Sequence, residues 1–253
     1  MFDAPPSFAH KLPTIIREHA PDEAIKYLIY SHDHTDHIGG ASAFKDIPDL
    51  NVLTAAAVAA SLTEDGFEGV IAPTETFEAQ HTLKLAGDVI ELRTASFHSE
   101  DIDVVIYLPE KKFVMAIDTI TPGEVPFMNF GATSDVGRYL KFFDYILEYD
   151  FDILLPGHVG ILGTRKDVID AKDYTFDVRN SITERLADFQ ARFEATFKTM
   201  GYQNANLAYR GVMEAMRDEC AAEIIGKWEG KLSVVDVWAD SHCETVLLYY
   251  IMH

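Results

Sequence analysis

Short apolar segments bounded by polar turns recur through the first part of the chain. Each is too short for a stable helix and is rich in β-branched or aromatic residues, a pattern typical of buried strands. Pro109, Glu110 and Lys111 separate two of these segments, which predicts a hairpin. The predicted strands lie at residues 24–30, 51–54, 89–93, 104–108, 112–117 and 153–155.

Apolar positions three or four residues apart predict helices elsewhere. Ser7 is the expected N-cap of a first helix, which ends before Pro21. An Ala-rich helix is expected at residues 55–62, and an amphipathic one at 136–149.

Beyond residue 164 the pattern is mostly helical. Thr164 with Asp167, and Ser181 with Glu184, have the spacing of capping boxes and predict two helix starts. One apolar stripe, which we interpret as core packing, comprises Ile182, Leu186, Phe189, Phe193 and Phe197. Residues 205–228 and 241–252 are further candidate helices. We therefore predict an α/β core at residues 1–165 and a helical C-terminal extension at 166–253, packed on the same domain.

Composition narrows the class of protein. The chain has 253 residues, of which 48% are apolar and 25% charged, as in a packed globular protein. Its 41 acidic and 21 basic residues give a net charge of −20, which disfavours nucleic acid and membrane surfaces as partners and leaves a small-molecule substrate. No apolar run reaches the ~18 residues that cross a bilayer. The start lacks a signal peptide, so the chain as written is expected in the cytoplasm, and export would need a different natural start.

The segment HDHTDH, directly after a predicted strand, carries candidate metal ligands at His32, His34, Asp36 and His37. His32 and His34 are two residues apart and point the same way from extended backbone. Imidazole and carboxylate together suit zinc, iron or manganese. The alternative, a polar loop with scattered histidines, is disfavoured because so many ligand side chains in one short segment are rare by chance.

Three more residues occupy strand ends. His98 lies between two predicted strands, Asp118 directly follows the predicted strand 112–117, and His158 follows the strand 153–155. Alone, each is better interpreted as structural, since an isolated histidine or strand-end aspartate usually caps a turn or lies at the surface. Together with HDHTDH they supply seven ligands at the strand ends, where α/β enzymes gather their sites. Surface or structural roles are expected for His10, His19, His81, His242 and His253.

In this order, HDHTDH, His98, Asp118 and the Gly-His pair at 157–158 resemble the metallo-β-lactamase superfamily over residues 24–165. The resemblance implies a four-layer αββα sandwich with a dinuclear metal centre on one edge. It places His32, His34 and His98 on the first ion, Asp36, His37 and His158 on the second, and Asp118 between both. The bridging aspartate is more similar to the glyoxalase II and lactonase branches than to the Cys-containing β-lactamases.

Two divalent ions at such a centre, Zn²⁺ in the first place and Fe or Mn as alternatives, lower the pKa of a bridging water toward ~7. Asp36 is the candidate catalytic residue, because its carboxylate could orient the resulting hydroxide. Second partners of the imidazoles are sought among Asp33, Thr35, Ser99 and Asp101, although a solvated loop carboxylate is the better interpretation of Asp33. The leading hypothesis is a hydrolase of an ester, thioester, lactone or amide, with β-lactams included but not favoured.

Two features have open interpretations. Residues 127–130 follow Asp118 and form either a substrate wall or a loop packed on the fold, and the sequence favours neither. Cys220 and Cys243 are too few for a disulfide scaffold, and they are either one pair or two unrelated thiols.

The start of the chain departs from the family pattern. Relatives carry several strands before the histidine motif, whereas His32 follows one predicted helix and one predicted strand. The first strands of the sandwich are therefore expected to be missing. An uncovered sheet edge favours pairing with a second chain, so a homodimer is a hypothesis.

Two other functions compete with hydrolysis. The first is a mono-iron redox enzyme on the same fold, similar to sulfur dioxygenases. His34 disfavours the di-iron flavoprotein branch, which has glutamate at that place. The second is a non-catalytic, truncated metal-binding relative, which the presence of all seven ligands disfavours.

Overall fold

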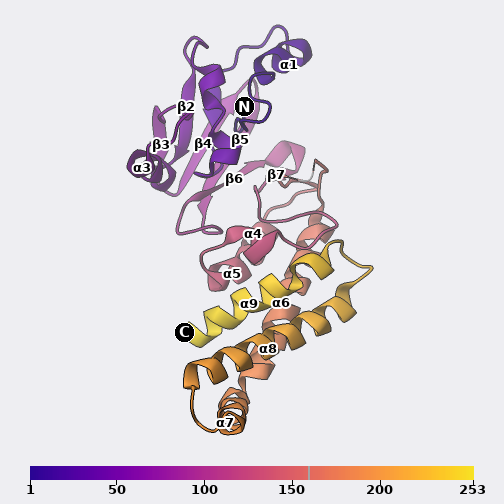
Figure 1. Ribbon diagram of the computed structural model, residues 1–253. Helices are drawn as coiled ribbons and strands as arrows, with labels where there is room; N and C mark the ends of the chain where they lie inside the picture. Colours follow the sequence, from indigo (N-terminus) through magenta and orange to yellow (C-terminus); the bar gives the residue numbers. More distant parts are fainter. Residues whose placement is uncertain (159) are drawn as a thin grey trace. The chain divides into compact units, whose positions relative to one another are not determined.

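A computed structural model describes residues 1–158 and 160–253. The chain divides into two compact units (Figure 1). The first comprises Met1–Ile117 with Tyr149–Phe151, and the second comprises Asp118–Glu148 with Asp152–His253. The first unit mixes strands and short helices, and the second is mainly helical. The division at residue 165 that the sequence predicts stays a prediction.

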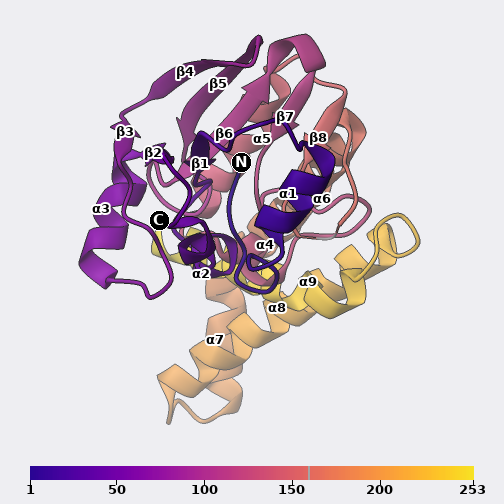
Figure 2. The same ribbon diagram turned by 90° about the horizontal axis from the view of Figure 1, so that it is seen from above.

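A parallel sheet in the order β1-β2-β3 lies in the first unit. Its strands are β1 (Tyr27–Ile29), β2 (Asn51–Ala55) and β3 (Glu75–Phe77). Leu28 and Val52 are partners across this sheet, and both are buried. Parallel neighbours need a crossover connection, which α3 (Ala56–Asp65) supplies between β2 and β3 (Figure 2). The predicted Ala-rich helix is thereby confirmed.

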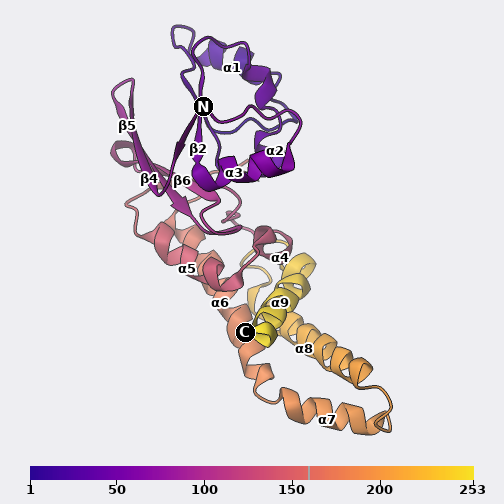
Figure 3. The ribbon, with the colours of Figure 1, turned by 90° about the vertical axis from the view of Figure 1, so that its left-hand side faces the viewer.

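Antiparallel strands form the second sheet of this unit, and Figure 3 shows the strands labelled β4, β5 and β6. In chain order these are β4 (Gln80–Leu85), β5 (Asp88–Ala95), β6 (Asp103–Leu108) and β7 (Phe113–Met115). A 3₁₀ turn, η2 (Pro109–Lys111), joins β6 to β7 and confirms the predicted hairpin. The first four residues of β6 are buried.

Short helical segments precede and follow β1 in the chain. They are α1 (Leu12–His19), α2 (Thr35–Ile38) and the 3₁₀ turn η1 (Ala41–Phe44). The predicted N-cap at Ser7 is wrong, because residues 6–11 form turns and α1 begins only at Leu12. Pro13 lies in its first turn, where the missing N–H would have no helical partner.

Long helices make up most of the second unit, and α6, α8 and α9 pack on one another (Figure 1). The elements are β8 (Ile153–Leu155), α4 (Met128–Ala132), α5 (Val136–Leu147), α6 (Arg165–Leu186), α7 (Phe189–Thr199), α8 (Ala205–Trp228) and α9 (Val235–Met252). A disulfide joins Cys220 of α8 to Cys243 of α9, with the two Cα atoms 6.0 Å apart. Of the two alternatives that the sequence leaves open, the structure therefore has the disulfide pair and not two unrelated thiols. Of the described residues, no helix combines the length and apolar character that a bilayer span needs.

Helix starts in this unit follow the sequence only in part. Thr164 and Asp167 form the predicted capping box. Ser181 and Glu184 do not, because α6 runs without interruption through both positions. The buried Ser181 hydroxyl instead donates a hydrogen bond to the Glu223 carboxylate, 2.8 Å away. A tertiary partner thus replaces the local capping role that the spacing predicts.

The predicted apolar stripe is divided between two helices. α6 ends at Leu186, and Phe189, Phe193 and Phe197 belong to α7. No residue of α7 is fully buried, so its aromatic rings are not core as predicted. The rings of Phe189 and Phe193 instead contact Tyr209 of α8, at centroid distances of 5.1 and 6.3 Å. Likewise α9 begins at Val235, earlier than the predicted start at 241.

Helix α9 holds the segment that follows Asp118. The buried His242 imidazole stacks on Phe130, contacts the Tyr174 hydroxyl through Nδ1 at 2.8 Å, and contacts the Phe127 carbonyl through Nε2 at 3.1 Å. A carbonyl only accepts, so Nε2 donates and Nδ1 accepts from Tyr174. Phe130 is thus packed inside this unit, whereas Phe127 and Met128 are largely exposed.

Acidification is expected to destabilise the second unit through His242. Burial lowers the pKa of His242 from 6.5 to about 4, against the opposing effect of the Phe127 carbonyl. Unfolded His242 therefore binds a proton at a higher pH than folded His242 does, so stability falls as the pH drops through this interval. Between pH 7 and pH 5 the expected loss is about 2 kcal/mol, measured by urea unfolding at both values.

The matched variant is His242→Gln, whose amide can still donate to the Phe127 carbonyl but does not titrate. Its unfolding free energy should lack this part of the pH dependence. An equal loss in the variant and the unmodified protein would assign the effect to other groups.

Candidate metal centre

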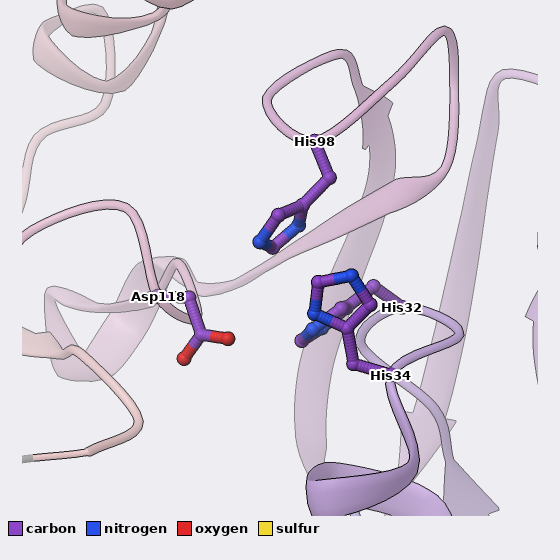
Figure 4. Close-up of side chains that lie close together, drawn as sticks. All are labelled: His32, His34, His98 and Asp118. Atoms are coloured by element: carbon purple, nitrogen blue, oxygen red, sulfur yellow. The ribbon is translucent and has the colours of Figure 1, made fainter. Parts of the chain in front are cut away.

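Among the described residues of the first unit, four imidazole rings meet at the ends of its strands. His32 follows β1, His34 and His37 lie at and in α2, and His98 follows β5. The ring centroid of His32 lies 4.6 Å from those of His34 and His37 and 4.5 Å from that of His98, and the His34 and His98 centroids are 4.4 Å apart. Ring nitrogens of His32, His34 and His98 lie within 4.8 Å of one another. Figure 4 labels these three together with Asp118, the first residue of the second unit.

The N-terminal residues shape the loop that carries HDHTDH. Met1 and Asp3 exchange backbone hydrogen bonds with Ile29, and Asp3 Oδ1 accepts the Ser31 N–H at 2.8 Å. The Ala4 N–H donates to the His37 carbonyl at 2.7 Å. These bonds tie the first residues to both ends of the motif, so the N-terminal segment is part of the site's scaffold.

A glycine is required where this scaffold packs most closely. The Gly40 N–H donates to the Ala4 carbonyl at 2.8 Å. A Cβ at Gly40 would lie 2.3 Å from the Ala9 Cβ and 2.7 Å from the Ala4 carbonyl oxygen. Any side chain there would push the N-terminal residues away from the motif.

Residues outside the motif contact the second nitrogen of two imidazoles. His32 Nδ1 lies 2.8 Å from the Ser31 hydroxyl, and His98 Nδ1 lies 2.6 Å from Asp103 Oδ1. Such partners orient a ligating imidazole and leave Nε2 for the metal. Sequence reasoning missed Asp103, which lies one residue before the predicted strand 104–108 and outside any ligand motif.

Two of the four residues that the sequence nominated for this role, Asp33 and Asp101, make other contacts. Asp33 accepts a hydrogen bond from Ser61 of α3, so it ties the motif loop to that helix. The exposed Asp101 shapes the loop after β5 through Ser96, whose hydroxyl accepts the Asp101 N–H at 3.0 Å.

Asp36 and His37 lie beside each other in α2. Asp36 Oδ2 is 3.4 Å from His37 Nε2, and the Asp36 side chain is 58% exposed while that of His37 is 8% exposed. His37 Nδ1 is 3.8 Å from Asp3 Oδ2. The Asp36 carboxylate therefore lies against a candidate metal ligand and is at the same time accessible to solvent water.

Asp118 and His158 lie together in the second unit. His158 Nε2 is 3.2 Å from Asp118 Oδ1, and the Asp118 N–H donates to the carbonyl of Pro156, which follows β8. Asp118 has a positive φ of 65°, a conformation that costs energy in a non-glycine residue and often occurs at functional sites. Its side chain is 10% exposed and that of His158 is 62% exposed.

The donor chemistry of these residues fits a divalent cation. Neutral imidazole nitrogens and carboxylate oxygens are the ligands of zinc, iron and manganese. The Asp103 and Ser31 contacts provide the orientation that metal-ligating histidines have. The chain thus has a His/Asp cluster suited to divalent metal binding.

Comparison with known proteins agrees with this chemistry. Residues 4–158 match the family model described as the metallo-beta-lactamase superfamily. The chain is similar to the structure of a metallo-beta-lactamase from Pontibacter korlensis, with 22% identity, a TM-score of 0.56 and coverage of 65% of this chain and 75% of that one. For a metallo-beta-lactamase from Hirschia baltica the identity is 16% and the TM-score 0.56, with coverage of 68% and 78%. At these identities the likeness shows the fold.

One curated relative is an O-demethylase subunit. The chain is 25% identical over 167 residues to the 2,4-dinitroanisole O-demethylase subunit alpha of Nocardioides sp. (strain JS1661). The match covers 64% of this chain and 48% of that protein, so the chain spans about half the length of this relative.

Proposed function

Because the chain belongs to the metallo-beta-lactamase superfamily and has its α/β fold with a helical C-terminal region, we propose that it is a metal-dependent hydrolase with a dinuclear zinc centre. The observation that carries the proposal is the imidazole cluster of the first unit. Histidines from separate segments converge there, and two of them are held through Nδ1.

We propose the ligand sets that membership of the family implies for this chain. His32, His34 and His98 take the first ion, and Asp36, His37 and His158 take the second, with Asp118 shared. The contacts within each unit support these sets, because Asp36 already lies against His37 and Asp118 against His158.

When bound, zinc supplies a coordinated water of lowered pKa and polarises the substrate carbonyl oxygen. The chain's own residues then have distinct tasks. Asp36 is exposed, so its carboxylate can accept a hydrogen bond from the attacking water and orient it. Ser31 and Asp103 keep the rings of His32 and His98 in place. The proposed substrates are esters, thioesters, lactones and amides of small molecules.

The curated relative favours a second candidate substrate class. The name of that protein describes removal of a methyl group from 2,4-dinitroanisole, an aryl methyl ether activated by nitro groups. Hydrolysis at such an electron-poor centre needs the same activated water as hydrolysis of an ester. We therefore include nitro-activated aryl ethers among the proposed substrates.

Removal of metal is expected to abolish turnover reversibly. The purified protein should contain zinc by elemental analysis and hydrolyse at least one compound of a panel of esters, thioesters, lactones, amides and 2,4-dinitroanisole. A chelator should remove the activity, and Zn²⁺ should restore it. Redox-active iron without zinc would instead support the mono-iron redox enzyme, and metal without any turnover would support the non-catalytic relative.

A further inference from the structure

The buried carboxylate of Asp103 stands behind His98 and has no part in the ligand sets above. Asp103 is the first residue of β6, and its exposed fraction is 5%, as is that of His98. Oδ1 lies 2.6 Å from His98 Nδ1, while Oδ2 accepts the N–H groups of Phe97 and His98 at 2.7 and 2.8 Å. One side chain therefore holds both the backbone and the ring of the same residue.

The hydrogen-bond chemistry selects a tautomer. An ionised carboxylate only accepts, so the short contact to Oδ1 requires the proton of His98 on Nδ1. A neutral imidazole with Nδ1–H has its lone pair on Nε2, the nitrogen that can then bind a cation. His32 differs, because its Nδ1 partner is the Ser31 hydroxyl, which can donate or accept.

The next residue of β6, Val104, makes a hydrogen bond to the loop that carries HDHTDH. The Val104 N–H donates to the Ser31 carbonyl at 2.7 Å, and Ser31 in turn contacts His32. The start of β6 thus links the His98 loop and the motif loop. A rigid strand positions both loops, which is how precise ligand geometry is maintained.

We propose that Asp103 is a positioning residue that holds His98 in the Nδ1–H tautomer and so makes Nε2 of His98 the metal-binding nitrogen. The part concerning metal rests on the proposed function, whereas the tautomer can be tested without metal. The added negative charge behind the ring also strengthens binding of a cation in front of it.

The substitution Asp103→Asn separates the tautomer from packing. Its amide oxygen can replace Oδ2 and keep both backbone hydrogen bonds, which places the NH₂ group against His98 Nδ1. The reverse orientation would keep the ring contact but lose both backbone bonds, so it is disfavoured. His98 must then accept through Nδ1 and carry its proton on Nε2, which blocks the ligand atom.

The matched control is Asp101→Asn in the same loop. Asp101 is exposed, and its carboxylate contacts the Ser96 hydroxyl at 3.4 Å. Like Asp103→Asn, this substitution removes one negative charge near the site, but it does not change the contact of the His98 ring. Its zinc affinity is expected to stay within about twofold of that of the unmodified protein, as for other surface changes.

The experiment uses the full chain in two states. In metal-free protein, long-range ¹H–¹⁵N spectra report the tautomer of His98, assigned from the signal that disappears in His98→Gln. We expect Nδ1–H in the unmodified protein and Nε2–H in Asp103→Asn. In a zinc competition assay, Asp103→Asn should lower the affinity of the protein for one of the two zinc ions by about 10- to 100-fold.

Each outcome decides the inference. An Nε2–H tautomer in the unmodified protein, or an unchanged Nδ1–H tautomer in Asp103→Asn, overturns it. Should Asp103→Asn fail to fold, Asp103→Ser replaces it and must show a smaller Nδ1–H population. If the unmodified protein binds no zinc, the proposed function fails, and the metal-free spectra still decide the role of Asp103.

Discussion

Replacing His34 by alanine is expected to lower hydrolytic activity by more than about 100-fold, because loss of a partner behind a ligand already costs 10- to 100-fold. The ring of His34 lies against those of His32 and His98, so its removal takes one of the proposed ligands from the first ion. Zinc content should fall from two ions toward one. Activity on the best substrate of the panel and elemental analysis measure the two effects.

The fold is expected to survive this change. His34 is the N-cap of α2, but its side chain makes no capping hydrogen bond. Alanine therefore takes no side-chain capping hydrogen bond from the helix start, and the metal-free variant should unfold within about 0.5 kcal/mol of metal-free unmodified protein. His10→Ala is the matched control, since His10 is exposed and lies in the turns before α1. Equal activity and zinc content in His34→Ala and His10→Ala would remove His34 from the site.

Loss of the disulfide is expected to cost the second unit about 3 kcal/mol of unfolding free energy. The bond between Cys220 and Cys243 closes a loop with a sequence separation of 23. Closing a loop of this length lowers the entropy of the unfolded chain, which stabilises the folded state by about 3 kcal/mol. Both cysteines are fully buried between α8 and α9. The double variant Cys220→Ala/Cys243→Ala should therefore unfold at lower urea concentration.

Fluorescence reports this transition selectively, because both tryptophans of the chain, Trp228 and Trp238, lie in the second unit. The first unit has its own sheets and supplies the imidazole cluster, so the amide signals of β5 and β6 should be unchanged in the variant. Unmodified protein denatured without reductant should show no free thiol. Two free thiols there, or an unchanged urea midpoint, would contradict the predicted contribution.

Local spacing was a good guide where neighbours in sequence are also neighbours in space. HDHTDH begins three positions after the last residue of β1, and its imidazoles converge because a strand end and one turn of helix determine their directions. Pro109 and the next two residues formed the predicted hairpin for the same reason. Ser7 and Ser181 are exceptions, because neither caps a helix. The first helix starts only at Leu12, with a proline in its first turn, and the Ser181 hydroxyl donates to Glu223 of another helix.

By itself, the sequence of this protein determined its fold class, its family and the residue types of a metal site, because strand periodicity and ligand spacing are local properties of the chain. Tertiary structure alone decided that Cys220 pairs with Cys243, that Asp3 supports the motif loop, and that Asp103 stands behind His98. These contacts form between strands, loops and helices brought together by burial. Which acceptor meets which donor there depends on packing geometry, which no local pattern encodes.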